Sequence, residues 1–591
     1  AYTTGVNEGL RRLNAKPFEY LLLQQEPVEW QEEDTVLTVL SMYLDLQYKD
    51  GKRERTLGLI KSTFDNSLFA FLNPKGSIWD AAIDETQFHP ATMPEFSSIS
   101  SALNHPIKKA SSLAQTDYSS EEFPGSNNWA IAGTISKTGS AIIANDMHLG
   151  IRVPNTWFRA SFEYLSDNKK IKVTGLTLPG TPLMVTGSNG DVAWGFTNSY
   201  GDWNDVIELE INEDGSQYLT PNGFIPFTIH QHIIAVKGQP SVKTTSKETI
   251  WGPVIGKNDK QKMLAFRWVA HDLQAVNFYP QQLETVKTVE QAFIIASKSG
   301  LPAQNMVVGD KAGNIGWTIA GPIPQRSTEF GEVPTSWANG QNYWTEYLPS
   351  DEYPKVLNPQ QKRLWTANSR VVGGEMLKKL GNGGYALGAR SQQIKAGLFA
   401  QEKFNEKHLL SIALDDRALF LKRWQKFVLT NVLNDKSLTS NPHRTEVKEL
   451  LSIDKLNAST DSVAYRFVRN FRINLRDSIF NHINEKLTSL DNDYSFHTIR
   501  HQIETPLWQL ITEQPDNFLV NDNRNWQDYF NDAFTKTYAD MTIDQPFSQA
   551  TWGQQNTTNI KHPLTNGVPF LSKWLNMPIT KLAGDSYMPR V

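Results

Sequence analysis

The chain has 591 residues, of which 39% are hydrophobic and 11% are aromatic, a composition typical of a globular protein with a sizeable core. The net charge is −4 and Lys and Arg form no dense run, which argues against nucleic acid as a partner. The chain contains no cysteine, so disulfides, thiolate metal sites and cysteine nucleophiles are excluded. No stretch approaches the roughly 20 apolar residues of a membrane-spanning helix, so we expect no membrane span.

The first part of the chain is predicted to change from helix to linker. Residues 7–48 have helical patterning, and the acidic run Glu32–Asp34 suits a helix N-terminus. Between about residues 94 and 125, Ser becomes frequent and large apolar residues become rare, and the segment ends in the turn-prone run Ser119–Gly125. We interpret this segment as an exposed linker.

From Ser126 onward the pattern changes to strands. Short apolar or alternating runs separated by turn signals predict strands at Trp129–Ala132, Ser140–Ala144, Trp157–Tyr164 and Ile171–Val173. Between about residues 402 and 511 the period becomes helical, which predicts an inserted or covering helical region. No internal repeat of 20 to 50 residues is evident, so a solenoid or propeller is disfavoured.

Common catalytic motifs are absent from the sequence. It contains no G-x-S-x-G elbow, no H-E-x-x-H and no P-loop. The pairs His230/His232 and His497/His501 have the spacing of two metal ligands, but neither pair has an evident third ligand. Surface or hydrogen-bonded histidines are therefore the favoured interpretation of both pairs.

The junction Gly125-Ser126 is the most informative position, because the linker ends there and a strand begins at once. Cleavage after Gly125 gives Ser126 a free α-amino group, whose reference pKa is about 7.7 to 8.0, so one residue carries nucleophile and base. Glycine at position 125 permits the strained backbone that attack by Ser126 Oγ on its carbonyl requires. Taken alone, however, the dipeptide is better explained as the ordinary start of a strand.

Longer motifs change that balance. The run Ser126–Ala130, followed by Ala144–Leu149, resembles the start of the β subunit in the penicillin acylase family of N-terminal nucleophile hydrolases. Further landmarks of that family occur downstream in the family's order: Asn189–Asn198, Asp310–Gly316, Thr366–Arg370, Gly388–Arg390, and Trp552-Gly553 through His562–Leu564. Upstream, Gly5–Asn7, Pro17–Tyr20 and Trp30 with Asp34 resemble the late part of the α subunit.

The resemblance implies an organisation and a fold. Residues 1–96 correspond to the C-terminal part of the α subunit, 97–125 to the spacer peptide and 126–591 to the β subunit, with a helical insertion at about 402–511. The implied fold is α+β, a four-layer αββα sandwich with an added helical region. The resemblance also implies a periplasmic or secreted protein, and relative to the family both ends of this chain look trimmed.

The resemblance implies a role for five residues. Ser126 is the nucleophile and its own amino group is the base, while the side-chain amide of Asn368 and the backbone N–H of Asn198 stabilise the oxyanion. His148 lies beside the nucleophile, and Arg390 holds Asn368 and the amino end of the serine. A purely structural histidine and an unrelated surface arginine are the alternatives for these last two positions.

A structural calcium ion is also implied. Asp202-Trp203-Asn204-Asp205 resembles the calcium loop of the family, and carboxylate and carbonyl oxygens are the ligands that Ca²⁺ prefers. The expected ligands are Glu54, Asp202, Asn204, Asp205 and Pro324. A carboxylate that some members place after the oxyanion asparagine has no clear equivalent here, so a solvated acidic turn stays the alternative.

The function that follows is a self-processing amidohydrolase that cleaves an acylated small molecule, penicillin-type or N-acyl homoserine lactone-type, through an acyl-enzyme. Its partners are the substrate and the two fragments, α and β, of one precursor. Leu149 and side chains of residues 42–48 are expected to line an apolar acyl pocket. Two alternatives stay open: a Trp-rich binding protein without catalysis, and a relative that is never processed.

Overall fold

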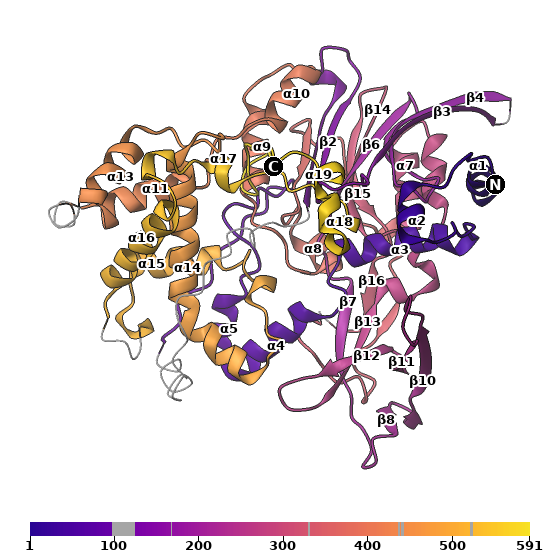
Figure 1. Ribbon diagram of the computed structural model, residues 1–591, viewed down its shortest axis with the longest axis horizontal. Coiled ribbons are helices and arrows are strands. Elements are labelled where there is room, and N and C mark those ends of the chain that lie inside the picture. The colour runs from indigo at the N-terminus through magenta and orange to yellow at the C-terminus, as the bar shows by residue number, and fades with distance from the viewer. Residues whose placement is uncertain (97–124, 167, 329–330, 435–437, 439–441, 520–523) are drawn as a thin grey trace.

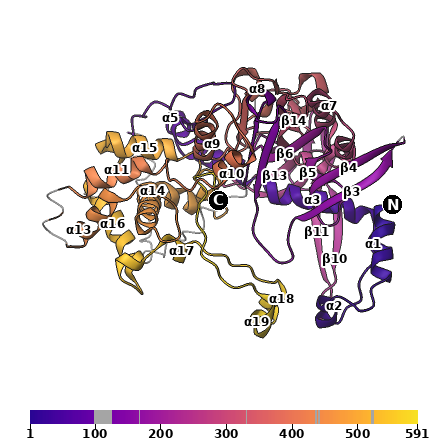
Figure 2. The same ribbon diagram turned by 90° about the horizontal axis from the view of Figure 1, so that it is seen from above.

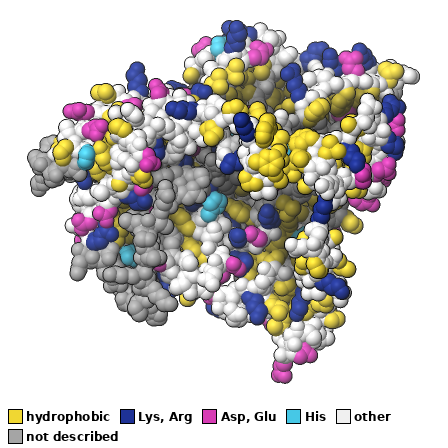
Figure 3. Space-filling view, viewed as in Figure 1, with side chains coloured by type: hydrophobic (Ala, Val, Ile, Leu, Met, Phe, Trp, Pro, Cys, Tyr) yellow, Lys and Arg dark blue, Asp and Glu magenta, His cyan; other side chains and the backbone are white. Residues whose placement is uncertain are grey.

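The computed structural model describes residues 1–96, 125–166, 168–328, 331–434, 438, 442–519 and 524–591. The expected spacer 97–125 therefore lies outside the described residues, apart from Gly125. Among the described residues, no helix is both long enough and apolar enough to cross a bilayer. On the described part of the face in Figure 3, basic and acidic side chains are interspersed.

The N-terminal part is helical, as its patterning predicts. Its helices are α1 (Tyr2–Arg11), α2 (Phe18–Leu23), α3 (Glu32–Leu46), α4 (Lys52–Thr63) and α5 (Asn66–Leu72). A capping box between Gln31 and Asp34 starts α3, where three acidic residues also favour the helix N-terminus. Tyr43 of α3 is fully buried and its hydroxyl donates to the carbonyl of Ala275 at 2.8 Å, which fixes α3 against the following part of the chain.

Two antiparallel sheets form the centre of the molecule. The smaller has the order β19-β1-β2, and all seven residues of its central strand are buried. The larger has the order β18-β15-β14-β6-β5-β4-β3. The strands of the two sheets are β1 (Gly125–Ile131), β2 (Ile142–His148), β3 (Phe158–Ser166), β4 (Lys169–Thr177), β5 (Met184–Ser188), β6 (Val192–Asn198), β14 (Gln304–Asp310), β15 (Ile315–Ala320), β18 (Lys355–Leu357) and β19 (Arg363–Thr366).

The two sheets pack face to face between helices. Strands β1 and β2 lie against β6 and β14, and the side chain of Asn145 in β2 donates to the carbonyl of Phe196 in β6 at 2.9 Å. Helix α7 (Val289–Lys298) covers the outer face of the larger sheet, while α9 (Ala389–Phe399) and α10 (Glu406–Ala413) cover the smaller one. These four layers form the predicted αββα sandwich (Figure 1).

A third sheet extends from this sandwich, in the order β10-β11-β12-β13-β7 (Figure 1). Its strands are β7 (Asn204–Glu208), β10 (Thr228–Ile234), β11 (Val242–Thr249), β12 (Gly252–Lys257) and β13 (Met263–Trp268). Two hairpins accompany it, β8 (Gln217–Thr220) with β9 (Gly223–Pro226) and β16 (Pro324–Arg326) with β17 (Trp344–Tyr347). Strand β7 brings the expected calcium loop into this sheet.

A helical region with its own large core lies beside the sandwich, on the left in Figures 1 and 2. Its central helix, α14, has 28 residues, 17 of them buried. The helices of this region are α11 (Lys422–Phe427), α13 (Pro442–Ile453), α14 (Val463–Leu490), α15 (Glu504–Glu513), α16 (Trp526–Thr542) and the short α17 (Trp552–Gln555). Three short helices elsewhere are α8 (Gly374–Leu380), α18 (Leu564–Gly567) and α19 (Ser572–Leu575). The region thus continues past residue 511, where its end was expected.

Candidate active site

Ser126 is the second residue of β1 and lies buried between the two sheets, with 5% of its surface exposed. Pairing with β2 places it opposite Met147 and places Gly125 opposite His148. A side chain at position 125 would lie 2.7 Å from Asn368 Oδ1 and 3.1 Å from Arg390 Nη2. A larger residue there would have to displace the side chain of Asn368 or Arg390, a reason for glycine that adds to the expected one.

Two asparagines meet at Ser126, one from the end of β6 and one from the loop after β19. The backbone N–H of Asn198, at the end of β6, donates to Ser126 Oγ at 3.3 Å. Asn368 accepts from the backbone N–H of Ser126 through Oδ1 at 2.8 Å and donates through Nδ2 to the carbonyl of Asn198 at 2.9 Å. Asn368 has φ +67°, a conformation that asparagine adopts more readily than most residues. Both asparagines that were expected to stabilise the oxyanion therefore form a hydrogen bond with Ser126, Asn198 as a donor to Oγ and Asn368 as an acceptor from the backbone N–H.

Arg390 joins this group from the first turn of α9. Its Nη1 donates to the carbonyl of Ser126 at 3.0 Å and to Asn127 Oδ1 at 2.7 Å, and its Nη2 donates to Asn368 Oδ1 at 2.8 Å. These partners are neutral oxygens, and burial lowers the pKa of Arg390 to about 10. The guanidinium is still protonated at neutral pH, so the site contains a buried positive charge beside the serine.

His148 ends β2 and is also largely buried. Its Nε2 lies 3.2 Å from Asp146 Oδ2 and 3.4 Å from Asn127 Nδ2. Burial lowers the pKa of His148, although the Asp146 carboxylate opposes the shift, so the ring is neutral at pH 7. These polar contacts run to Asp146 and Asn127, which fits an orienting or a structural role for His148.

An apolar pocket opens at Ser126. Leu149, Met42 and Leu46 line it, as expected from the acyl-pocket prediction, whereas Tyr48 lines a separate small cavity beside Glu54. Further lining residues are Val39, Met147, Trp157, Leu178, Leu183, Met184, Val185, Phe196, Pro280, Leu283, Leu301 and Pro302, with Thr181 and Gln304 as polar exceptions. Such a lining suits an uncharged hydrocarbon group.

The expected calcium ligands are brought together only in part. Glu54, Asp202 and Asp205 are buried near one another, but Arg326 forms ion pairs with Asp202 at 3.1 Å and with Asp205 at 2.9 Å. Burial raises the pKa of Asp202 to about 7 even though Arg326 opposes the shift. In the described part of the chain, no three His, Cys, Asp or Glu side chains are arranged to hold a metal ion. The oxygens are of the kind that calcium binds, but Arg326 occupies them, so the loop as folded does not fit the ion.

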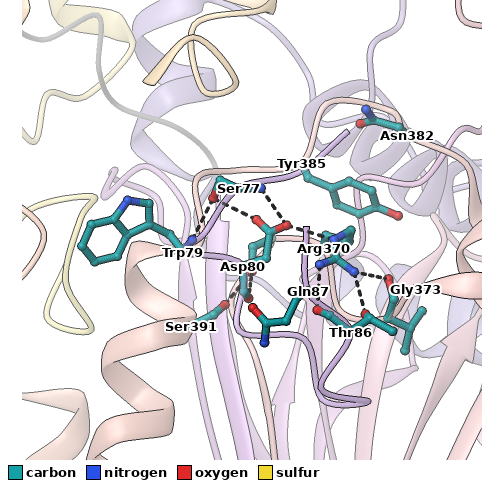
Figure 4. Close-up of polar contacts among 12 residues, drawn as sticks. Ser77, Trp79, Asp80, Thr86, Gln87, Arg370, Gly373, Asn382, Tyr385 and Ser391 are labelled. Atoms are coloured by element: carbon teal, nitrogen blue, oxygen red, sulfur yellow. Dashed lines mark hydrogen bonds and ion pairs between the residues drawn. The ribbon is translucent and has the colours of Figure 1, made fainter. Parts of the chain in front are cut away.

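Sequence reasoning also missed a second buried ion pair, between Asp80 and Arg370 (Figure 4). Arg370 Nε donates to Asp80 Oδ2 at 2.9 Å, and Ser77 donates to the same carboxylate through its backbone and its hydroxyl. Burial raises the pKa of Asp80, with Ser77 and Arg370 opposing. Three further guanidinium hydrogens of Arg370 are donated to Thr86 and to the carbonyl of Val372.

This ion pair fixes the loop that carries Asn368. Arg370 lies two residues after Asn368, and Asp80 belongs to the segment before the linker. A Cβ atom at Gly388, just before Arg390, would lie 2.2 Å from the carbonyl oxygen of Trp79, so this segment also packs tightly against the start of α9. The signal available in the sequence was the run Thr366–Arg370, in which only Asn368 was assigned a role.

The sequence model of the penicillin amidase family matches residues 1–590. Acyl-homoserine lactone acylase QuiP of Pseudomonas aeruginosa is 26% identical over 445 residues, which are 72% of this chain and 51% of that protein. Penicillin acylase 2 proenzyme of Pseudomonas sp. (strain SE83) is 29% identical over 382 residues, which are 63% of this chain and 47% of that protein.

A solved structure agrees with the fold. Thermostable penicillin G acylase from Alcaligenes faecalis matches with a TM-score of 0.56 and 18% identity, over 72% of this chain and 80% of the other, which supports the fold alone. The chain spans about half the length of the two curated relatives. Because the family model covers nearly every residue, the chain belongs to the penicillin amidase family.

Proposed function

We propose that this chain is an amide-hydrolysing acylase whose nucleophile is Ser126. The observation that carries the proposal is the position of the serine hydroxyl. It lies at the start of a buried strand, accepts the Asn198 N–H and faces an apolar pocket. The names of the relatives, acyl-homoserine lactone acylase and penicillin acylase, support the same reaction class.

Cleavage of the Gly125–Ser126 bond supplies the base. The freed amine takes the place of the backbone N–H that now donates to Asn368 Oδ1, next to the hydroxyl of its own residue. The guanidinium of Arg390 disfavours a second positive charge nearby, so the pKa of the amine falls below its reference value of about 7.7 to 8.0. The unprotonated amine then accepts the proton of Ser126 Oγ as the hydroxyl attacks the substrate carbonyl.

The tetrahedral intermediate places negative charge on the former carbonyl oxygen. The Asn198 N–H and Asn368 Nδ2 are the donors for this oxygen, and the loss of one such donor raises a barrier by about 3 to 4 kcal/mol. Asn368 Nδ2 carries two hydrogens, so its bond to the Asn198 carbonyl does not exhaust it. On collapse the α-ammonium returns the proton taken from Ser126 Oγ to the leaving nitrogen, so the amine product departs and an acyl-serine remains. Water then hydrolyses the acyl-serine with the unprotonated α-amine again as base.

Because the pocket beside Ser126 is lined by apolar side chains, we expect it to bind an apolar acyl group of the substrate. N-acyl homoserine lactones and penicillins with uncharged side chains both fit this description. A periplasmic or secreted location belongs to the same proposal, since it rests on family resemblance, and cell fractionation with a full-length gene tests it.

Denaturing mass spectrometry with N-terminal sequencing tests the proposal. Active protein is expected to separate into two fragments, one of which begins at Ser126, and to hydrolyse chromogenic acyl amides. Ser126→Ala is expected to stay uncut and inactive, whereas Ser161→Ala, which changes an exposed serine on β3, is expected to behave as wild type.

The other outcomes separate the rival functions. An intact wild-type chain that hydrolyses acyl amides contradicts the role of the α-amine. An intact chain without activity supports either a binding protein or an unprocessed relative, and retained ligand binding distinguishes these two.

A further inference from the structure

Arg326 lies where the sequence leads one to expect a metal ion. It ends β16 in the hairpin with β17, and its side chain is only 10% exposed. Its guanidinium lies among the oxygens of the Asp202–Asp205 loop, which immediately precedes and enters β7.

Arg326 binds four of the oxygens. Its Nε donates to Asp205 Oδ2 at 2.9 Å, and its Nη2 lies 3.1 Å from Asp202 Oδ1. The same Nη2 lies 3.2 Å from the carbonyl of Asp202 and 3.3 Å from the carbonyl of Asn204. The guanidinium thus contacts two carboxylates and two backbone carbonyls, which is the kind of donor set that calcium uses.

Other groups bind or cover most of the remaining carboxylate oxygens of this site. Trp344 Nε1 donates to Asp205 Oδ2, and a Cβ atom at Gly331 would lie 1.5 Å from Asp205 Oδ1, so backbone packs against that oxygen. Glu54 Oε2 accepts the backbone N–H of Val206 at 2.7 Å. Only Glu54 Oε1 and Asp202 Oδ2 are buried without a hydrogen-bond partner among these carboxylate oxygens of the described structure.

Two carboxylate oxygens are too few for calcium, which takes about 6 to 8 oxygen ligands. We propose that the guanidinium of Arg326 is the resident cation of this loop and replaces a calcium ion. A planar guanidinium can bind carboxylate and carbonyl oxygens in several directions at once, which suits this position.

The replacement has a consequence for how the expected fragments hold together. Glu54 lies on α4, before the linker, while Asp202, Asp205 and Arg326 all follow it. A calcium ion in this loop would make their association depend on the calcium concentration. A covalently attached cation removes that dependence, so the folded protein is insensitive to chelators.

Thermal unfolding and elemental analysis test the wild-type protein. The midpoint of unfolding is expected to be the same in excess EDTA and in millimolar calcium chloride, and the protein desalted from calcium is expected to contain far less than one calcium per chain. A lower midpoint in EDTA, or one calcium bound per chain, overturns the proposal. These measurements need no variant and do not depend on acylase activity, so they stand if the proposed function fails.

Arg326→Gln sharpens the test, because it removes the cation and leaves the carboxylates. Its midpoint is expected to fall and then to rise by a few degrees on addition of calcium. The unfolding midpoint of Arg326→Lys is expected to fall less and to respond less to calcium. The control is Arg267→Gln, since Arg267 also stacks on Trp344 but pairs with Asp272. Its midpoint is expected to show no calcium response, and an Arg326→Gln variant that folds without any calcium response contradicts the proposal.

Discussion

Two buried arginines of this chain lie in similar isolation from solvent but face different partners. Arg390 contacts carbonyl and amide oxygens beside Ser126, and burial lowers its pKa to about 10. Arg326 is also penalised by burial, but the Asp202 and Asp205 carboxylates outweigh that penalty and raise its pKa. The charge of Arg326 is therefore compensated where it lies, whereas that of Arg390 remains effective at the serine.

This difference in partners makes Arg326 a structural cation and Arg390 a cation that influences the reaction at Ser126. A compensated ion pair holds two segments together and contributes little field elsewhere. An uncompensated charge beside a nucleophile lowers the pKa of an adjacent amine and attracts a developing oxyanion. Substitutions in the two regions should accordingly affect different measurements, and the following predictions are ordered by expected size.

The largest effect is expected from Asn368→Ala, which removes the amide that bonds with Arg390, Ser126 and Asn198. Loss of an oxyanion donor is expected to lower kcat about 100- to 1,000-fold with a smaller change in KM. Steady-state kinetics on processed protein measure this. The matched variant in the other region, Asp205→Asn, is expected to lower the unfolding midpoint while kcat changes little. An equal loss of kcat in Asn368→Ala and Asp205→Asn would contradict the separate roles of the two regions.

Arg390→Met is expected to lower kcat/KM about 100-fold, because a misplaced reacting group costs that order of magnitude. The acidic limb of its pH profile is also expected to move to higher pH, since the amine of Ser126 loses a neighbouring positive charge and regains a higher pKa. Arg390→Lys keeps a positive charge beside the amine, so its acidic limb should stay close to that of wild type. Arg326→Gln should not move the limb. An unchanged limb in Arg390→Met refutes the electrostatic role.

Leu149→Trp is expected to reduce kcat/KM for long acyl chains more than for short ones. Leu149 lines the pocket beside Ser126, and a single methylene in such a pocket is worth about 1 to 3 kcal/mol, so the preference should change about tenfold or more. A panel of acyl amides graded by chain length measures this. Uniform loss over the whole panel shows that the acyl chain binds elsewhere.

The smallest effect is expected from His148→Gln on acid stability. Burial lowers the pKa of His148 in the folded state below the unfolded value of about 6.5. Its contribution is present above pH 6.5 and is lost as the pH falls through the lowered pKa, because the unfolded state then binds more protons. Unfolding midpoints between pH 7 and pH 5 should decline less in His148→Gln than in wild type. His232→Gln, an exposed control on β10, should follow wild type.

Sequence patterns located the residues around Ser126 but could not place them in space. Asn198, Asn368 and Arg390 were assigned by resemblance, and spacing alone would have left each of them as one polar residue among many. Gly125 was expected on grounds of backbone strain, yet its close contact with Asn368 depends on the path of a distant loop. Strand pairing over long sequence separations supplies this information, and local patterns do not contain it.

The same limit explains the features that sequence reasoning missed. Arg326 lies two residues after Pro324, which was named as a ligand, but only the register of β16 with β17 shows where its side chain points. Asp80 and Arg370 are far apart in the chain, so neither gave a local signal. The helical region was expected to end near residue 511, but a capping box at Asn525 and Asp528 starts a further helix, α16.

The central claim is that Ser126 carries the acyl group on a chain that begins with it. Wild-type protein treated with a serine-reactive acylating inhibitor, then analysed by denaturing mass spectrometry and peptide mapping, tests this directly. The account predicts one adduct per molecule, on the fragment whose first residue is Ser126, and none on Ser126→Ala. An adduct on another residue, or on Ser126 within an uncut chain that is fully active, contradicts it.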